Sequence, residues 1–493
     1  MSETVENRFN LVDEPWIPVA DVGLVSLRKL FTDRSLRFLG GNPLQKIAIT
    51  KLLLAIVQAA WTPEDETEWS NVGSEGMAQK ALSYLEEKKE LFWLYGERPF
   101  LQMPNIAKAA RQNYGAVLPY IASGNSTVLK QSQIEKVVPD AEKAQLVVVQ
   151  MGFATGGKKT DNSIVLSSEY KGKSKAGKPG VSLGYYGYLH SFLMGKDLFE
   201  TLWLNMFTSN EIERIESFEK GLGIIPWEKM PEGEDCENAR ILRSSYFGRL
   251  IPFCRFLLLG DDYLHYSEGI SHLTHKDGGF DPSITVDFGS AKPKAIWVDP
   301  EKRPWRQLPA LLSFLNITDK KTFDCLQLRN CIPRARMNTE KFGIWAGGLM
   351  VSNKAGEQFV TGMDDFVESE ILLYSKYIGA EWFALIKVEL KMLDDLSSML
   401  YAAINSYYRQ LKSDGSNSAK KASNLFWQLC ERNYEELVYA CNDLTGVTSK
   451  AMRTIFADYI NKSYNTYCPS DTARQLDAWA ANRPNLKKFL TGN

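Results

Sequence analysis

The C-terminal quarter of the chain contains the pattern that most restricts its fold. From Phe383 to Leu411, apolar residues recur mainly in steps of three and four. This spacing is typical of a helix that packs one apolar face against other helices. If the helix begins near Tyr374, it is about 55 Å long at roughly 1.5 Å per residue. Its apolar positions are Phe383, Ile386, Leu390, Leu393, Leu400, Ile404, Tyr407 and Leu411.

Further helical patterns follow, separated by short polar or glycine-containing links. We expect a second helix to end near Cys441, a third to cover 448–463, and a fourth to follow the capping sequence 469–471. Consecutive helices with short connections favour an antiparallel four-helix bundle. Because the sequence changes character near Asp364, we assign residues 365–493 to this bundle.

Residues 1–364 lack such a regular pattern. Helix and strand signals follow one another irregularly, without βαβ alternation and without a glycine-rich dinucleotide-binding turn. The expected fold class is therefore α+β, with a large irregular mixed N-terminal domain before the C-terminal bundle. The expected elements are a strand–turn–strand over 8–30, helices over 43–61, 76–88, 139–150 and 305–316, a helix or extended element over 188–207, a hairpin turning at 260–262, and a strand over 342–350.

Composition narrows the functional class only slightly. The 493 residues carry a net charge of −1, which allows local basic patches but does not by itself indicate a nucleic-acid partner. There is no run of 18 apolar residues, and the first residues are polar, so we expect a cytoplasmic protein without membrane segments. The seven cysteines are scattered and form no Cys-x-x-Cys motif, which favours reduced thiols over disulfides or zinc.

Catalytic signals are weak. Of four histidines, His272 and His275 have half the spacing of a metal site, but no further ligand stands beside them. The carboxylate pairs at 364–365 and 394–395 fit a helix start and a helix surface better than an active site. No nucleotide-binding P-loop, serine-hydrolase or zinc-protease motif is present. We therefore expect a non-enzymatic protein that has no cofactor and no metal and that acts by binding.

The segment 152–187 is the strongest binding signal. It contains eight glycines and six lysines against two acids. Glycine lets a main chain approach another molecule closely, and lysines suit a polyanion. A solvated surface loop is the alternative interpretation. Further basic residues on predicted loops strengthen the case for a phosphate-facing surface; these are Lys292, Lys294, Arg334, Arg336 and Lys354.

Four short blocks resemble one known family. Residues 10–19 (NLVDEPWIPV), 98–102 (RPFLQ), 195–205 (GKDLFETLWLN) and 305–308 (WRQL) are similar, in this order, to the large subunit of the type I-E CRISPR surveillance complex Cascade, the CasA family. The resemblance extends over essentially the whole chain, and the first block is its most specific part.

The resemblance implies a non-catalytic subunit near the 5′ end of the guide RNA. Members of the family recognise the protospacer-adjacent motif (PAM) in double-stranded target DNA, help to open the duplex and allow R-loop formation, and provide the docking site for a helicase-nuclease. The implied partners are the other Cascade subunits, the 5′ handle of the CRISPR RNA, the target DNA and the helicase-nuclease. No membrane is implied. A scaffold subunit that contacts only guide RNA and neighbouring subunits is the main alternative, and a hydrolase that uses His272 or His275 is a third.

The family recognises the PAM from the minor groove with a glycine loop, a lysine finger and a wedge. The resemblance places the glycine loop at Gly152, Gly156 and Gly157, followed by Lys158 and Lys159. Glycine backbone can enter a narrow groove while neighbouring lysines hold phosphate. Because the minor groove distinguishes A·T from G·C only coarsely, we expect a tolerant PAM.

The other two parts fall on later segments. The finger is Lys292 or Lys294, just before Trp297. The wedge falls in the turn after Gly347–Gly348, where the family has a glutamine and this chain has Asn353 and Lys354. Gln358 stands a little further on.

Two more segments are expected to contact nucleic acid. The lysine-rich stretch with Lys171, Lys173, Lys175 and Lys178 suits the phosphate backbone. By the resemblance, the segment 123–136 matches a loop that contacts the guide-RNA handle. Some family members carry cysteine pairs that bind zinc, and this chain lacks them, which again predicts no metal.

Overall fold

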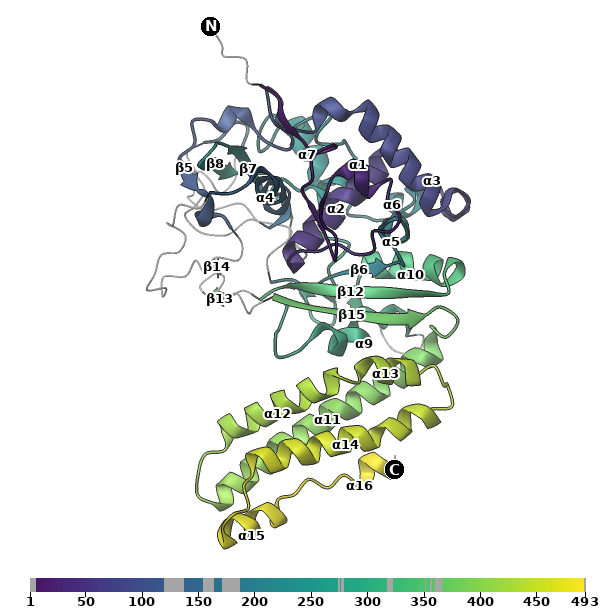
Figure 1. The fold of residues 1–493 in the computed structure, drawn as a ribbon, viewed down its shortest axis with the longest axis vertical. Helices are drawn as coiled ribbons and strands as arrows, with labels where there is room; N and C mark the ends of the chain where they lie inside the picture. The colour runs from purple at the N-terminus through teal and green to yellow at the C-terminus, as the bar shows by residue number, and fades with distance from the viewer. Residues whose placement is uncertain are drawn as a thin grey trace. The chain divides into compact units, whose positions relative to one another are not determined.

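A computed structural model of the chain describes residues 6–118, 137–153, 164–170, 187–273, 275, 279–316, 322–350, 352–354, 357–359 and 366–491. The chain forms two compact units. The first comprises Met1–Pro304 and Thr322–Glu370, and the second comprises Trp305–Lys321 and Ile371–Asn493 (Figure 1). The boundary predicted from the sequence lies after residue 364, and no pattern in the sequence groups residues 305–321 with the C-terminal helices.

Helix α2 (Pro43–Ala60) is the central helix of the first unit. Asn42 and Gln45 form a capping box at its start, and Pro43 occupies the first turn, where a missing N–H costs nothing. The helix contacts α3, α4, α5, α8 and β12, so it is apolar on nearly all sides. The length and composition of this helix alone would also allow it to cross a membrane, but 78% of its 18-residue apolar stretch is buried inside the protein.

Helix α3 (Glu66–Glu87) is longer than the sequence indicated. Its first helical residue, Glu66, follows the N-cap Asp65 and lies ten residues before the predicted start, and the helix is interrupted at Gly73, whose φ is +65°. Because Gly73 is not helical, the first half of α3 does not continue the apolar spacing of the second half, and the sequence pattern did not reveal it. Trp69 of α3 stacks on Trp203 with ring centroids 3.8 Å apart, and each indole N–H donates to the other residue's carbonyl oxygen.

The strands form several small sheets rather than one large one, which confirms the irregular α+β class. The main sheet has the order β15-β12-β6, built from Phe366–Tyr374, Lys341–Leu349 and His190–Met194, all antiparallel where the register is defined. The predicted turn at 260–262 joins β7 (Arg255–Leu259) to β8 (Tyr263–Glu268) as expected. The remaining strands are β1 (Arg8–Asn10) with β4 (Trp93–Tyr95), β2 (Ile17–Val19) with β3 (Gly23–Val25), β5 (Arg111–Asn113) with β8, β9 (Val286–Asp287) between β10 (Lys294–Ala295) and β11 (Phe323–Asp324), and β13 (Ser352–Lys354) with β14 (Glu357–Phe359).

Two predicted elements are divided in the structure. The stretch 188–207 is strand β6 followed by helix α5 (Leu198–Asn205), because a tight approach of Gly195 to Glu200 and Thr201 turns the chain between them. The stretch 305–316 forms short helical turns, including α9 (Leu308–Leu311), instead of one helix. Helix α9 belongs to the second unit. Further α-helices in the described part of the first unit are α1 (Leu27–Leu30), α4 (Asp140–Gly152), α6 (Ser209–Glu213), α7 (Glu237–Arg243), α8 (Phe247–Leu250) and α10 (Leu326–Asn338).

The second unit is helical, as the sequence predicted. Its long helices α11 (Ala380–Gln410), α12 (Ser416–Glu431) and α14 (Val447–Tyr467) all contact one another, and α13 (Tyr434–Ala440), α15 (Ala473–Ala481) and α16 (Lys487–Thr491) are short. The first helix starts at Ala380 and not near Tyr374, because Phe366–Tyr374 is strand β15. The predicted second helix is divided between α12 and α13 at residues 432–433.

The acidic pair 394–395 has a structural role on α11. Arg306 forms an ion pair with Asp394 at 3.1 Å and lies over the ring of Trp427 at 3.3 Å from its centroid. Asp395 pairs with Lys391 one turn earlier on the same helix. These contacts explain the two carboxylates without catalysis.

An ion pair lies in the core of the helical unit. Arg453 of α14 donates to both carboxylate oxygens of Glu389 on α11, with N···O distances of 3.0 and 2.8 Å. Both side chains are only 3% exposed. Ser449 donates to the same carboxylate at 3.2 Å. Removing one partner would leave the other as an uncompensated buried charge.

A second buried polar cluster links α2 to β6 in the first unit. Lys51 of α2 forms an ion pair with Asp281, and both side chains are almost fully buried. Asp281 accepts hydrogen bonds from the backbone N–H and the hydroxyl of Ser283, at 3.0 and 2.8 Å. The Ser283 hydroxyl lies 2.8 Å from Nδ1 of His190. Burial, reinforced by the positive charge of Lys51, lowers the pKa of His190 to about 3.

The variant Arg453→Met should destabilise the helical unit by about 3–5 kcal/mol, because it leaves Glu389 charged and buried. The measurement is urea denaturation of the full chain followed by far-UV circular dichroism. Lys391→Met is the matched control, since it removes a solvent-exposed pair worth about 0.5 kcal/mol or less. Equal effects of the two variants would contradict the assignment of Glu389–Arg453 as a structural pair.

Stability should also fall as the pH is lowered from about 6.5, the usual pKa of histidine. The pKa of His190 is about 3 in the folded chain, so between these values the unfolded chain binds a proton that the folded chain does not. The expected slope is up to about 1.4 kcal/mol per pH unit for each such histidine. His190→Gln should flatten the dependence of the unfolding free energy between pH 7 and 5. An unchanged slope would show that His190 does not stay neutral in the fold.

Candidate nucleic-acid interface

The end of α4 fixes where the predicted glycine loop begins. Gln150 is fully buried, and its Nε2 donates to the carbonyl oxygen of Val117 at 2.6 Å. Gly152 is the last residue of the helix. Among the described residues, a Cβ added there would meet only Pro252 Cγ at 3.9 Å, an ordinary contact. Packing against this part of the chain therefore does not require glycine at position 152.

The finger candidates lie on and beside strand β10. Lys294 is its first residue and pairs in register with Asp287 of β9, while Lys292 lies in the connection between the two strands. Both lysines are exposed, and among the described residues neither forms an ion pair. Their charges are therefore available to a phosphate. Trp297, three residues beyond, is 36% exposed.

The wedge candidates lie on a hairpin that follows β12. Strand β13 pairs with β14 in the register Asn353↔Gln358 and Lys354↔Glu357. This pairing puts Gln358, which the sequence placed five residues after Asn353, directly opposite it across the hairpin. The structure thus pairs two antiparallel strands in the segment where the sequence predicts the wedge.

The start of β6 brings the three segments together. The ring of Phe153, next to Gly152, lies 5.5 Å from that of His190. Tyr188 forms an isolated β-bridge with Trp297, and their ring centroids are 5.0 Å apart. A Cβ at Gly348 would lie 2.7 Å from the Tyr188 carbonyl oxygen. The end of α4, the segment that follows β10 and the end of β12 therefore all contact residues 188–190.

Close packing explains why two glycines precede the hairpin. A Cβ at Gly348 would also lie 2.8 Å from Val298, and one at Gly347 would lie 2.8 Å from the Trp345 ring. Contacts this short do not occur for real Cβ atoms. The sequence suggested only that these glycines end a strand, but Gly348 allows β12 to approach the Tyr188 backbone and the Val298 side chain.

Several predicted residues lie outside the part of the chain that the structure describes. They are Gly156, Gly157, Lys158 and Lys159 of the glycine loop, Lys171, Lys173, Lys175 and Lys178 of the lysine-rich stretch, and the guide-handle segment 123–136. For Asn353, Lys354 and Gln358 the structure describes the strands on which they lie.

Arg334 is not part of a phosphate-facing surface, contrary to the sequence-based prediction. Its side chain is fully buried, pairs with Glu211 at 3.2 Å and donates to the carbonyl oxygen of Met206 at 2.6 Å. It lies on α10, next to the exposed Arg336. Sequence spacing could not separate the two, because the helix period that buries one of them is obscured by Pro333.

His272 has no free ring nitrogen for catalysis. Its Nε2 lies 2.5 Å from the Pro252 carbonyl oxygen and its Nδ1 lies 3.4 Å from Nη1 of Arg249. Burial, with the charge of Arg249, lowers its pKa to about 3. His275 lies 3.3 Å from the hydroxyl of Tyr188. These contacts oppose the hydrolase alternative. Over the described ranges, no three His, Cys, Asp or Glu side chains gather as metal ligands would.

Comparison with known proteins gives concordant results. The family model described as CRISPR-associated protein Cse1 matches residues 10–461. A CasA/Cse1 protein of Thermus thermophilus is 33% identical over 164 residues, a stretch that spans 30% of this chain and 32% of that relative. The chain thus aligns in sequence with about a third of this relative's length.

Solved structures share the fold over nearly the full chain. Thermobifida fusca Cse1 superposes with a TM-score of 0.75 at 17% identity, covering 98% of each chain. A chain of a structure described as a CRISPR RNA-guided surveillance complex gives a TM-score of 0.69 at 15% identity, covering 96% of this chain and 98% of that one. With a family model matching residues 10–461, the chain belongs to the CRISPR-associated Cse1 (CasA) family.

Proposed function

We propose that this chain is the non-catalytic large subunit of a type I-E CRISPR RNA-guided surveillance complex and that it recognises the PAM in duplex DNA. Membership of the Cse1 family supports the first part, as does the likeness to a chain of a surveillance complex. In such complexes base pairing reads the target sequence, and protein reads a short duplex motif. The proposed partners are the other subunits, the CRISPR RNA with its 5′ handle, and target DNA, in the cytoplasm.

The convergence of three segments on β6 is the observation that carries PAM recognition. A protein that recognises bases in a DNA groove needs its contacting residues on one side of its surface and at fixed distances from one another. The helix end at Gly152, the strand with Lys294 and the hairpin with Asn353 are all anchored beside residues 188–190. A scaffold that bound only guide RNA would need no such junction.

Each segment has a distinct proposed task. The glycine loop after Gly152 approaches the minor groove with its backbone, and Lys158 and Lys159 hold phosphates. Lys292 or Lys294 extends into the groove. The hairpin with Asn353 inserts beneath the PAM and compensates part of the unstacking cost, which is a few kcal/mol per base step. We further propose that the opened complex presents the docking site for the helicase-nuclease.

Lys292→Ala combined with Lys294→Ala should weaken capture of PAM-bearing duplex by the reconstituted complex. If both lysines contact phosphate, the slope of log affinity against log salt should fall by about 2. The measurement is an electrophoretic mobility titration at several salt concentrations. Lys108→Ala with Lys229→Ala is the matched control, since both lysines are exposed and lie on other segments. Equal affinity for all PAM variants, before and after substitution, would favour the scaffold alternative.

Asn353→Ala combined with Lys354→Ala should slow duplex opening more than it weakens initial capture. The wedge acts only when the first base pair separates, so permanganate reactivity of thymines next to the PAM should appear more slowly. A duplex with a preformed mismatch bubble at that position is the control, because it needs no wedge and should restore wild-type rates. A defect that persists with the bubble would place these residues in capture instead, and Gln358→Ala tests the residue opposite Asn353 in the same assay.

A further inference from the structure

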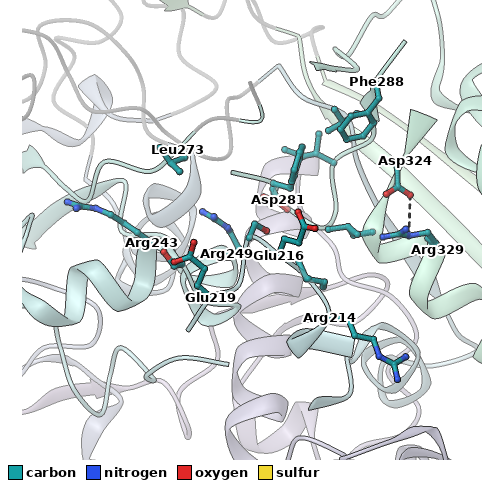
Figure 2. A pocket seen from close by; sticks show the side chains of 17 residues that line it. Arg214, Glu216, Glu219, Arg243, Arg249, Leu273, Asp281, Phe288, Asp324 and Arg329 are labelled. Atoms are coloured by element: carbon teal, nitrogen blue, oxygen red, sulfur yellow. Dashed lines mark ion pairs between the residues drawn. The ribbon is translucent and has the colours of Figure 1, made fainter. Parts of the chain in front are cut away.

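A cavity of about 680 Å³ lies in the first unit and is lined by none of the lysines assigned to DNA contact. Its walls come from the chain after α6, the end of α7, α8, the segment 280–288 and α10. The volume falls within the roughly 300–1,000 Å³ of small-molecule sites. Figure 2 shows charged side chains gathered along this cavity and Phe288 above them.

Arg249 is the most unusual residue in the wall. It is 2% exposed, yet its Nε has no hydrogen-bond partner among the described residues. Within the same part of the chain, its hydrogen bond is from Nη1 to the neutral His272 ring, at 3.4 Å. Within the described residues no carboxylate lies within ion-pair distance of it. A buried guanidinium without an acidic partner is costly, because the charge has lost its water.

The buried charges around Arg249 leave an excess of one positive charge. Asp281 is near enough to Arg249 to interact with it, but its carboxylate already pairs with Lys51. The buried set of Lys51, Asp281 and Arg249 therefore sums to +1, which a single anionic group would neutralise.

The other charged residues of the lining are nearer to solvent. Arg243 pairs with Asp235, and Arg329 pairs with Asp324. The exposed residues Arg214, Glu216 and Glu219 add a net charge of −1, so the positive excess is confined to the buried part of the wall.

The opposite part of the lining is apolar and accessible. Phe288 is 43% exposed and its ring lies 5.6 Å from that of Phe280, while Leu273 is 59% exposed. Solvent-exposed aromatic faces in a cavity suit a flat aromatic group. Glu216 and Glu219, also in the lining and exposed, could accept hydrogen bonds from amino or hydroxyl groups.

The ligand chemistry that combines these features is a nucleotide. A phosphodiester carries one negative charge, and a base stacks on an aromatic ring with about 1–3 kcal/mol. The cavity wall also continues into the candidate interface, since β9 contributes Val286 to the lining and pairs with β10, which carries Lys294.

We propose that this cavity binds one nucleotide unit, with its phosphate at Arg249 and its base against Phe288. The unit is either a free nucleotide or part of a single strand. The inference does not depend on PAM recognition, because a free nucleotide would occupy the site equally well.

Calorimetry and fluorescence anisotropy with the full chain test this proposal. The probes are inorganic phosphate, thymidine 5′-monophosphate and a labelled oligothymidylate of eight nucleotides. Arg249→Gln should weaken nucleotide binding at least tenfold, and Arg249→Lys should retain part of it. Phe288→Ala should weaken binding of the nucleotide but not of phosphate. Leu24→Ala, an exposed apolar residue of the β2–β3 hairpin, is the matched control.

The outcomes distinguish a free nucleotide from a single strand, and they distinguish this inference from the proposed PAM recognition. Binding of the mononucleotide that depends on Arg249 and Phe288 supports a free ligand, and the same dependence for the oligonucleotide alone supports a strand. Binding of phosphate with no gain from the nucleoside, or nucleotide binding unaffected by Phe288→Ala, would overturn the inference. Because Phe288 is exposed, its variant tests the site even if Arg249→Gln does not fold. Loss of PAM capture in the Lys292/Lys294 variant with normal nucleotide binding would leave both proposals standing.

Discussion

The buried ion pair between Lys51 and Asp281 connects the segments of the first unit that form the candidate interface. Lys51 belongs to the central helix α2, and Asp281 begins the segment that continues into β9 and β10. Through Ser283 the same carboxylate is linked to His190, the first residue of β6. One buried charge pair thus joins the core helix, the finger strand and the strand that anchors the hairpin.

Two of the buried ion pairs among the described residues have different neighbours. Glu389–Arg453 is fully compensated, because the guanidinium and the carboxylate bond to each other twice. Lys51–Asp281 has the additional cation Arg249 nearby, and the adjacent imidazoles of His190 and His272 have pKa values of about 3 and so add no charge. The first arrangement stabilises a bundle, whereas the second leaves one buried guanidinium, that of Arg249, without a carboxylate partner among the described residues.

The elements predicted correctly from the sequence are those whose signals lie within a few neighbouring residues. The helix at Pro43 has its cap, its proline and its apolar run within a few residues, and the hairpin at 260–262 has its turn residues between two apolar strands. The start of the first C-terminal helix was placed too early because strand β15 alternates buried and exposed residues just before it. The burial of Arg334 was not predicted, because its ion-pair partner Glu211 lies more than a hundred residues away in the sequence and leaves no local pattern.

The glycines at 347 and 348 show why the candidate site was only partly predictable. Their identity was visible in the sequence, but their reason is the approach of β12 to the Tyr188 carbonyl and to Val298, segments that are remote in sequence. A Cβ at position 348 would lie too close to the Tyr188 carbonyl oxygen, so β12 needs glycine there to keep this approach. The distance between the proposed finger and wedge segments therefore depends on close packing at one small residue. Under the proposed function, the side chains that contact DNA can vary, since Asn353 and Lys354 stand where the resemblance predicts a glutamine, whereas the packing beneath them requires the glycine.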